Sequence, residues 1–188
     1  MPKPELPRGD AELITGISSG NLNSLGVLFD RYALDVRRFV GRLGVAPHHV
    51  DDLVQTTFLE VTHAASRFDG RISAKTWLFG IAAINVRRHR RSVARLAERL
   101  DDWARELRTL AAPESPADGY DNSLEAQRAL AALDKLSAKK REVFLMVAVE
   151  NATGEEAARA LGIPIATVWT RLHHARRELK AHLTKEEA

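Results

Sequence analysis

The side chains at positions 48–52 form the densest group that could bind a metal ion or transfer protons. His48, His49, Asp51 and Asp52 combine imidazole and carboxylate groups, which are common metal ligands and general bases. Two adjacent helical residues point in different directions, however, and acids in the first turn of a helix offset its dipole. No glycine-rich loop or third group completes a catalytic constellation here. We therefore predict no metal site, no cofactor, no catalytic residue and no enzymatic activity.

Arginine is concentrated in two series. The first runs through residues 87–108 and the second through residues 171–177, and an acidic stretch at 114–125 separates them. Guanidinium groups bind phosphate oxygens, and the net charge of +3 matters less than this distribution. Two basic patches are typical of a protein that holds nucleic acid in two places. Two solvated helix faces would give the same pattern, so charge alone leaves both interpretations open.

A helical period over residues 54–68 separates an apolar face from a polar one. The apolar face carries Val54, Phe58, Val61, Ala65 and Phe68. The opposite face carries Asp52, Gln55, Thr56, Leu59 and His63. Because Leu59 is the one apolar residue on the second face, the pattern predicts a surface that contacts another molecule.

A second helix is expected from Ser73, after a polar turn at residues 69–71. Its inner side would carry Trp77, Leu78, Ile81, Ile84 and Asn85. Its outer side would carry short residues followed by cations, namely Thr76, Gly80, Ala83, Arg87 and Arg90, with Arg91 nearby. Such a strip allows a backbone to come close and offers guanidinium groups, so it predicts contact with a phosphate chain.

The rest of the first half is also expected to be helical. Asp10 could cap a short helix that ends near Ile17, and apolar residues recur at helical spacing through residues 22–43. A helical pattern continues after Arg91 as far as Leu110. The stretch at 112–120 contains two prolines and a glycine, which predicts a linker and a domain boundary.

The second half contains signals for two helices joined by a tight turn. Ser137 can cap a helix, and Thr153 and Glu156 have the spacing of a capping box. The helix that this box starts would end at residues 161–162, and Pro164 would open a longer helix. Its apolar side carries Ile165, Val168, Leu172, Ala175, Leu179 and Leu183. This arrangement predicts a helix-turn-helix, with an ordinary helical hairpin as the alternative.

The opposite face of that longer helix has hydrogen-bonding, aromatic and cationic groups but no acid. It carries Ala166, Trp169, Thr170, His173 and Arg177, flanked by His174 and Arg176. A face of this kind favours binding to DNA rather than packing in a hairpin.

Composition limits the class of protein. The 188 residues allow one or two small domains, and 45% hydrophobic and 28% charged residues are typical of a globular chain. The absence of cysteine excludes disulfides and thiolate sites. No apolar run approaches the ~20 residues that span a membrane, and the N-terminal segment has no apolar signal region. We therefore expect no membrane insertion and a cytoplasmic location.

Several of these segments resemble the extracytoplasmic-function (ECF) group of bacterial RNA polymerase sigma factors. DDLVQTTF at 51–58, RFDGR at 67–71, WLFGIA at 77–82 and RRHRR at 87–91 are similar to the second region of the group. Residues 133–179 are similar to its fourth region throughout. The resemblance covers nearly the whole chain and implies an all-α protein of two helical domains on a flexible linker. The bounds would be a tail at 1–9, region 2 at 10–110, an acidic linker at 111–122 and region 4 at 123–188.

The resemblance implies a function and roles for particular residues. The chain would bind core RNA polymerase and direct it to promoters, touching DNA both as duplex and as unpaired strand. Core polymerase would contact Asp52, Gln55, Thr56 and Leu59. The upstream ten element would contact Phe68, Asp69, Arg71, Ser73, Lys75, Thr76, Trp77, Arg87, Arg88, Arg90 and Arg91. The upstream thirty-five element would contact Ala166, Thr167, Trp169, Thr170, Arg171, His173, His174, Arg176 and Arg177.

The sequence departs from the group at a few of these positions. Trp169 stands where Lys or Arg is usual, and Thr56 stands where an acid is usual. Ile84 stands where Asn is usual, with Asn85 one place on, and Gly80 and Ala83 are often arginine in the group. These departures predict an unusual promoter specificity.

Members of the group are often held inactive by an anti-sigma protein, so such a protein is a further expected partner. Two other classes of protein compete with the sigma-factor interpretation. A free-standing helix-turn-helix regulator with a helical sensor domain would need no polymerase surface, so the Asp52, Gln55 and Leu59 face argues against it. A nucleic-acid hydrolase would need a cluster of metal-binding carboxylates, which the sequence does not offer.

Overall fold

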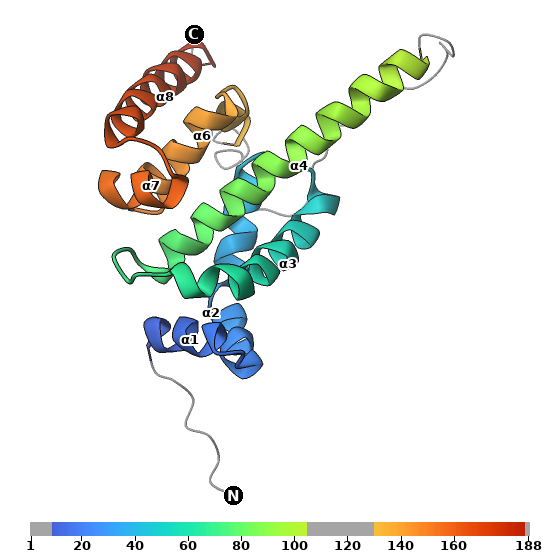
Figure 1. Ribbon diagram of the computed structural model, residues 1–188. Helices are drawn as coiled ribbons and strands as arrows, with labels where there is room; N and C mark the ends of the chain where they lie inside the picture. The colour runs from blue at the N-terminus through green and yellow to red at the C-terminus, as the bar shows by residue number, and fades with distance from the viewer. Residues whose placement is uncertain (1–8, 105–129, 187–188) are drawn as a thin grey trace, which may run out of the picture.

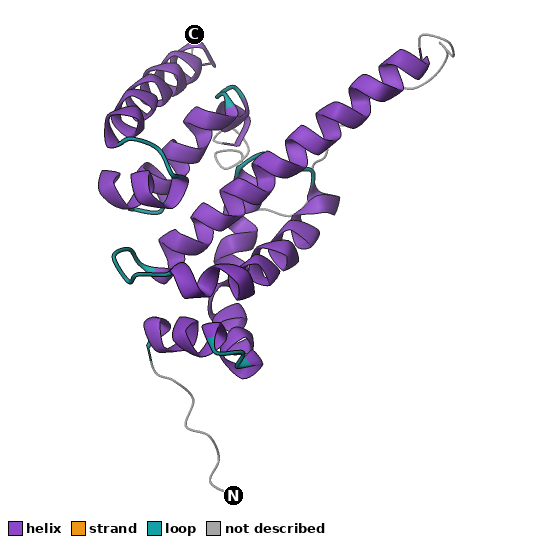
Figure 2. Cartoon of the chain, viewed as in Figure 1, coloured by secondary structure: helices purple, strands orange, loops and turns teal. Residues whose placement is uncertain are grey.

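The computed structural model describes residues 9–104 and 130–186, and all regular structure in these two ranges is helical (Figure 2). The prediction of an all-α protein is therefore confirmed. No helix in the same ranges is long and apolar enough to cross a membrane. Residues 1–8 of the predicted tail at 1–9, the predicted linker at 111–122 and Leu110 lie outside the described residues.

The first helical unit consists of five elements. They are α1 (Asp10–Ser18), α2 (Leu22–Arg42), α3 (Pro47–Ala64), a short 3-10 helix η1 (Ala65–Arg67) and α4 (Ala74–Ala104). Their apolar stripes meet in a core in which Phe39 of α2 stacks on Phe79 of α4, with ring centroids 4.3 Å apart. Burial of such large side chains stabilises the unit by about 1.5–3 kcal/mol each, which is how short helices are held together.

Helix ends in this unit differ in detail from the sequence prediction. Asp10 is not a cap: the N-cap of α1 is Gly9, and the Asp10 carboxylate accepts hydrogen bonds from Arg31 and Tyr32 of α2. Burial, together with this bond to Asp10, raises the pKa of the Tyr32 hydroxyl to about 12. The helix predicted over 54–68 ends earlier, because α3 stops at Ala64 and η1 tightens the last turn before Phe68.

The second helical unit contains the predicted helix-turn-helix. It consists of α6 (Ala138–Phe144), a π-helical turn η2 (Leu145–Val149), α7 (Gly154–Leu161) and α8 (Ile165–Glu186), and residues 130–134 before them are also helical. Ser137 lies at the N-cap position of α6, but its side chain makes no capping hydrogen bond.

The turn of the helix-turn-helix forms for the reasons that the sequence indicated. The Thr153 hydroxyl accepts from the Glu156 amide at 3.2 Å, and the Glu156 carboxylate accepts from the Thr153 amide at 2.9 Å. Gly162 then ends α7 with φ 64°, a left-handed conformation that costs glycine little. The predicted capping box and glycine turn are confirmed.

Helix α4 of the first unit also contacts the second unit. In Figure 1, α2 and α3 lie on one side of α4, and α6, α7 and α8 lie on the other. Contacts of α4 with α2, α3 and α7 agree with this view. The C-terminal part of α4 runs beyond the other helices. The two units are therefore packed together along the first half of α4.

Candidate polymerase and nucleic-acid interfaces

The outward face of α3 is exposed as predicted. Val54, Phe58 and Val61 are at most 5% exposed, whereas Leu59 is 65% exposed on the opposite side. The other exposed residues of that face are Asp52, Gln55, Thr56 and His63. Thr56 donates its hydroxyl to the Asp52 carbonyl at 2.8 Å, so this group is used within the helix. The face offers one isolated apolar side chain, a carboxylate and an amide to a partner.

The loop between α3 and α4 is ordered by short-range polar contacts. The Asp69 carboxylate accepts from the Arg71 amide at 3.1 Å, and Ser73 caps α4 by accepting from the Thr76 amide at 3.1 Å. The rings of Phe68 and Trp77 lie 5.0 Å apart at the base of the loop. Asp69, Arg71 and Ser73 are exposed. Two aromatic rings beneath an exposed polar loop could hold an unstacked base.

The outer strip of α4, Thr76, Gly80, Ala83 and Arg87, is not a surface in this structure. Thr76 is 7% exposed, Ala83 is fully buried and Gly80 is buried as well. A Cβ at Gly80 would collide with the Ala160 backbone carbonyl of α7. The backbone that comes close to the strip is therefore that of the second unit. The expectation that these residues face outward is wrong for this arrangement.

The inner side of α4 also differs from the prediction. Leu78 and Asn85 are buried as predicted, but Trp77, Ile81 and Ile84 are only half-buried. The fully buried residues that the prediction missed are Phe79, Ala82 and Val86. Their i, i+3, i+7 spacing was visible in the sequence, but a helix covered on two sides has no single apolar stripe.

Asn85 is unavailable to DNA. It is 4% exposed, and its amide donates to the Thr57 hydroxyl of α3 at 3.5 Å. Ile84, the preceding residue, is half-buried. The Asn85 side-chain amide therefore bonds within the core.

The predicted phosphate-binding cations of α4 fall into two groups. Arg87 and Arg90 are half-buried and turned to other parts of the chain: Arg87 lies 3.7 Å from the Glu142 carboxylate of α6, and Arg90 donates to the Leu43 carbonyl. Arg88 pairs with Glu60 at 3.1 Å but stays exposed, and Arg91 is exposed.

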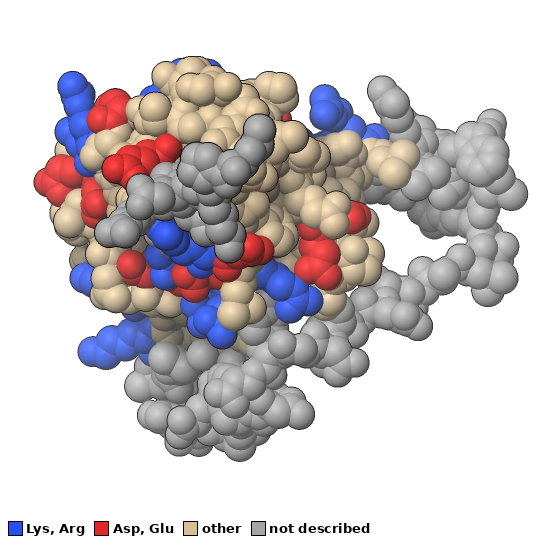
Figure 3. All heavy atoms as spheres, turned by 90° about the horizontal axis from the view of Figure 1, so that it is seen from below, with Lys and Arg blue, Asp and Glu red and all other residues tan. Residues whose placement is uncertain are grey.

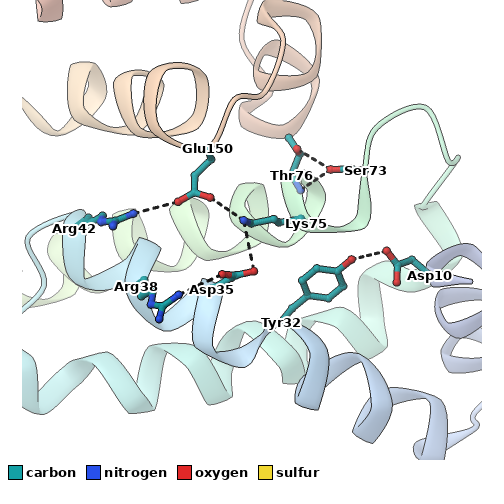
Figure 4. A network of polar contacts seen from close by, with 9 residues as sticks. All are labelled: Asp10, Tyr32, Asp35, Arg38, Arg42, Ser73, Lys75, Thr76 and Glu150. Carbon is teal, nitrogen blue, oxygen red and sulfur yellow. Dashed lines mark hydrogen bonds and ion pairs between the residues drawn. The ribbon is translucent and has the colours of Figure 1, made fainter. Parts of the chain in front are cut away.

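Lys75 belongs to a polar network that joins the two units (Figure 4). Glu150, just after η2, lies between Arg42 at 3.3 Å and Lys75 at 2.9 Å, and Lys75 also approaches Asp35 at 3.5 Å. Burial alone would lower the pKa of the Lys75 ammonium, but its bonds to the two carboxylates raise it. No local pattern in the sequence marks Glu150, because its partners Arg42 and Lys75 are far away in the chain.

A second link joins α6 to the end of α2. The Arg141 guanidinium donates to the Leu43 carbonyl at 3.0 Å and pairs with Asp134 at 2.9 Å. The neighbouring Glu142 side chain is fully buried, and burial raises the pKa of its carboxyl against the lowering influence of Arg87. No local pattern in the sequence marks Arg141 or Glu142 as a contact between the units.

The predicted recognition face of α8 is exposed. Val168, Leu172, Ala175 and Leu179 are at most 9% exposed and hold the helix to its unit. The residues on the opposite side are exposed, namely Ala166, Trp169, Thr170, His173, Arg176 and Arg177, with Thr167, Arg171 and His174 half-buried at its edges. Ile165, expected on the apolar side, is 39% exposed because it lies at the first position of the helix. No Asp or Glu lies on the exposed face before Glu178, which pairs with Lys140.

Trp169 packs on its own unit and also faces solvent. Its ring covers Gly154 at the start of α7, where a Cβ would overlap the six-membered ring of the indole. The side chain is still 49% exposed. The aromatic residue therefore braces α8 against α7 and offers its free edge to whatever the helix contacts.

Histidine and carboxylate side chains do not form a metal site in the described ranges. The rings of His48 and His49 lie 4.1 Å apart, and His49 meets His89 at 4.6 Å, so the two adjacent side chains do not diverge as expected. No group of three or more His, Asp or Glu residues in the described ranges has the arrangement that a metal ion needs. On the face in Figure 3, cations and carboxylates are interspersed.

Comparison with known proteins agrees with the two-unit fold. Residues 28–96 match the model of sigma-70 region 2, and residues 126–179 match that of sigma-70 region 4. The chain is 33% identical to the RNA polymerase sigma factor CnrH of Cupriavidus metallidurans over 93% of its length and 94% of that protein. It is 32% identical to the ECF RNA polymerase sigma factor SigC of Mycobacterium tuberculosis, covering 92% of each.

Two solved structures are similar as well. CnrH in complex with the cytosolic domain of CnrY aligns with a TM-score of 0.66 at 28% identity, covering 94% of this chain and 97% of that one. The sigma factor RpoE in complex with the anti-sigma factor NepR from Bartonella quintana aligns with a TM-score of 0.63 at 26% identity, covering 85% and 96%. Sigma factors direct RNA polymerase to promoters and are not enzymes. This chain belongs to the ECF RNA polymerase sigma factors.

Proposed function

We propose that the exposed face of α3 is the main contact with core polymerase. The contact would be made by Asp52, Gln55, Thr56 and Leu59. Leu59 supports this assignment. Its side chain is 65% exposed, and burying it against a partner would contribute favourably to the free energy of binding. The polar neighbours would set the orientation of the complex.

We propose that the α3–α4 loop and the start of α4 handle the upstream ten element. The loop residues Phe68, Asp69, Arg71 and Ser73 would hold an unpaired base, with Trp77 behind them. Lys75, Thr76, Arg87, Arg88, Arg90 and Arg91 would contact phosphates. Exposure of the loop and of Arg88 and Arg91 supports this proposal, whereas the other groups must first leave their present partners.

We propose that α8 reads the upstream thirty-five element in the major groove. The observation that carries this proposal is an exposed helix face without an acid, presented by a capped helix-turn-helix. Thr170 and His173 lie in its N-terminal half, where such helices meet base edges, and Arg176 and Arg177 lie further along. Trp169, braced on Gly154, would contact a sugar or a thymine methyl.

We further propose an anti-sigma protein as a regulatory partner and the cytoplasm as the site of action. One structural relative, RpoE, was solved with the anti-sigma factor NepR. A partner of this kind would compete with polymerase or DNA for the exposed surfaces of the chain.

The proposed function is tested by transcription in vitro with core polymerase and a library of promoters. The full chain is expected to direct initiation at a subset that shares two elements. Sequence-specific DNA binding without any need for core polymerase would instead identify a free-standing helix-turn-helix regulator.

A further inference from the structure

The first two turns of α8 present an apolar surface to solvent. Residues 165–170 contain no charged side chain. Ile165 is 39% exposed and Trp169 is 49% exposed, and Ala166 is exposed as well. Residues three and four apart are neighbours on a helix, so these three side chains form one patch, the apolar patch of α8. It lies at the N-terminal end of α8, which is the part of such a helix that meets base edges in the major groove.

Side chains that could read a base by hydrogen bonds are scarce in the same two turns. The Thr170 hydroxyl donates to the Ala166 carbonyl at 2.9 Å, so its proton is used within the helix, and Thr167 is half-buried. Guanine is usually read by Arg or Lys and adenine by Asn or Gln, and none of these occurs at 165–170. Thymine alone offers a methyl group in the major groove. The apolar patch of α8 therefore matches thymine better than the other bases.

The indole ring of Trp169 is held in place by a contact with α7. Gly154, the first residue of α7, lies beneath the ring, and a Cβ there would come 2.9 Å from the indole Cε2. The φ of Gly154 is not positive, so its backbone does not itself require glycine. The space that the indole fills is the physical reason for a residue without a side chain here. A ring that is fixed before binding loses little conformational entropy when it contacts DNA.

We propose that the apolar patch of α8 recognises thymine methyl groups in the upstream thirty-five element, and that Gly154 is a positioning residue for the Trp169 ring. This proposal rests on the proposed function, because it names the base that one part of α8 reads. The six residues at 165–170 extend for about 9 Å along the helix, which corresponds to two or three base pairs. The patch thus specifies thymine at one or two positions of the element.

The first experiment removes the thymine methyl group and nothing else. Holoenzyme assembled from the full chain and core polymerase is titrated with promoter duplexes in which each thymine of the element, on either strand, is replaced by deoxyuridine. Deoxyuridine keeps the hydrogen-bonding groups of thymine but lacks the methyl group. At one or two positions this replacement should weaken wild-type binding about 4-fold, the effect of one buried methyl group.

The second experiment repeats the titration with two variants and a control. Trp169→Lys replaces the ring by a cation, so it should bind both duplexes alike at those positions and change the salt slope by about one. Gly154→Ala keeps the tryptophan but displaces its ring, so it should reduce the discrimination and leave the salt slope unchanged. Gly26→Ala, where a Cβ meets nothing within 4 Å, is the matched control and should discriminate like the wild type.

Three results would contradict the proposal. Wild-type holoenzyme that binds the element specifically, yet binds thymine and deoxyuridine duplexes equally at every position, would overturn it, and this result needs no variant to be folded. Unchanged discrimination by Trp169→Lys would also overturn it, and unchanged discrimination by Gly154→Ala would remove the positioning role of Gly154. Wild-type holoenzyme without preference for any upstream thirty-five sequence would instead refute the proposed function.

Discussion

The same kind of helical pattern predicts an outer strip on α4 and an outer face on α8. In the structure the second unit covers the strip on α4, whereas the face on α8 is exposed. The α4 strip carries short residues followed by arginines, and the α8 face carries short, aromatic and polar residues followed by arginines. On α8 the residues that begin this face, Ala166, Trp169 and Thr170, are exposed, whereas on α4 Thr76, Gly80 and Ala83 are buried. Periodicity tells which residues share a face, but not which neighbour occupies it. The small residues on α4 allow the backbone of another helix to come close, as that of α7 does at Gly80.

The largest expected effect separates the two sides of α8. Leu172 is 2% exposed, so Leu172→Ala should destabilise the second unit by about 2–5 kcal/mol through lost burial and a cavity. Thr170→Ala, on the exposed side, should stay within ~0.5 kcal/mol. Urea denaturation followed by circular dichroism measures both. Equal losses of stability would show that the outer side of α8 is also structural.

The second prediction concerns the other exposed face, on α3. Gln55→Ala combined with Leu59→Asp should weaken binding to core polymerase by about 2 kcal/mol or more, roughly 30-fold, because a charge replaces an apolar contact. Stability should not change, since both side chains point away from the core. Leu22→Asp, at a leucine that is 74% exposed on α2, is the matched control. Titration of labelled protein with core polymerase gives the affinities, and wild-type binding by the double variant would refute the assignment.

The third prediction sharpens the division of labour along α8. Thr170→Ala and His173→Ala should each cost about 1–3 kcal/mol at particular promoter positions. Arg177→Ala should weaken binding to all sequences and reduce the salt slope by about one. Binding to a promoter set with each upstream position varied, at several salt concentrations, distinguishes the two classes. A uniform loss in all three variants would remove Thr170 and His173 from base reading.

The smallest expected effect is a pH dependence of the free energy of unfolding, caused by Glu142 of α6, which lies near Arg87 of α4. Glu142 is fully buried, and neither carboxylate oxygen has a hydrogen-bond partner among the described residues. Burial raises its pKa above 4.5, although Arg87 and Arg90 of α4, Arg171 of α8 and Lys139 of α6 oppose this. The folded state therefore binds the proton more tightly than the unfolded state, and stability falls as the pH rises from the unfolded pKa through the folded one.

Glu142→Gln stays neutral, so its stability relative to wild type should increase over that pH window and then level off. Unfolding measured at several pH values provides the test, with Glu155→Gln on the exposed start of α7 as control. A relative stability that falls with pH would mean that the attraction to Arg87 outweighs burial.

The sequence alone determines much of the local structure of this protein. The capping box at Thr153 and Glu156 and the turn at Gly162 depend only on neighbouring residues, and both form as predicted. The exposed face of α3 and the buried side of α8 follow from helical periodicity, because each of these helices has a core on one side and solvent on the other. Motifs quoted from the sequence also led to the sigma-factor family, which the comparisons confirm.

Tertiary structure decided what lies far apart in the chain. Asp10 could cap α1, but it bonds to Arg31 and Tyr32 once α2 folds back on α1. Glu150 meets Arg42 and Lys75 across a long stretch of chain, and no local pattern marks such a pair. The burial of the α4 strip has the same cause. The sequence shows a glycine at position 80, but only the packing of the two units places the Ala160 carbonyl next to it. Local periods specify helices and their faces, whereas long-range packing specifies what each face touches.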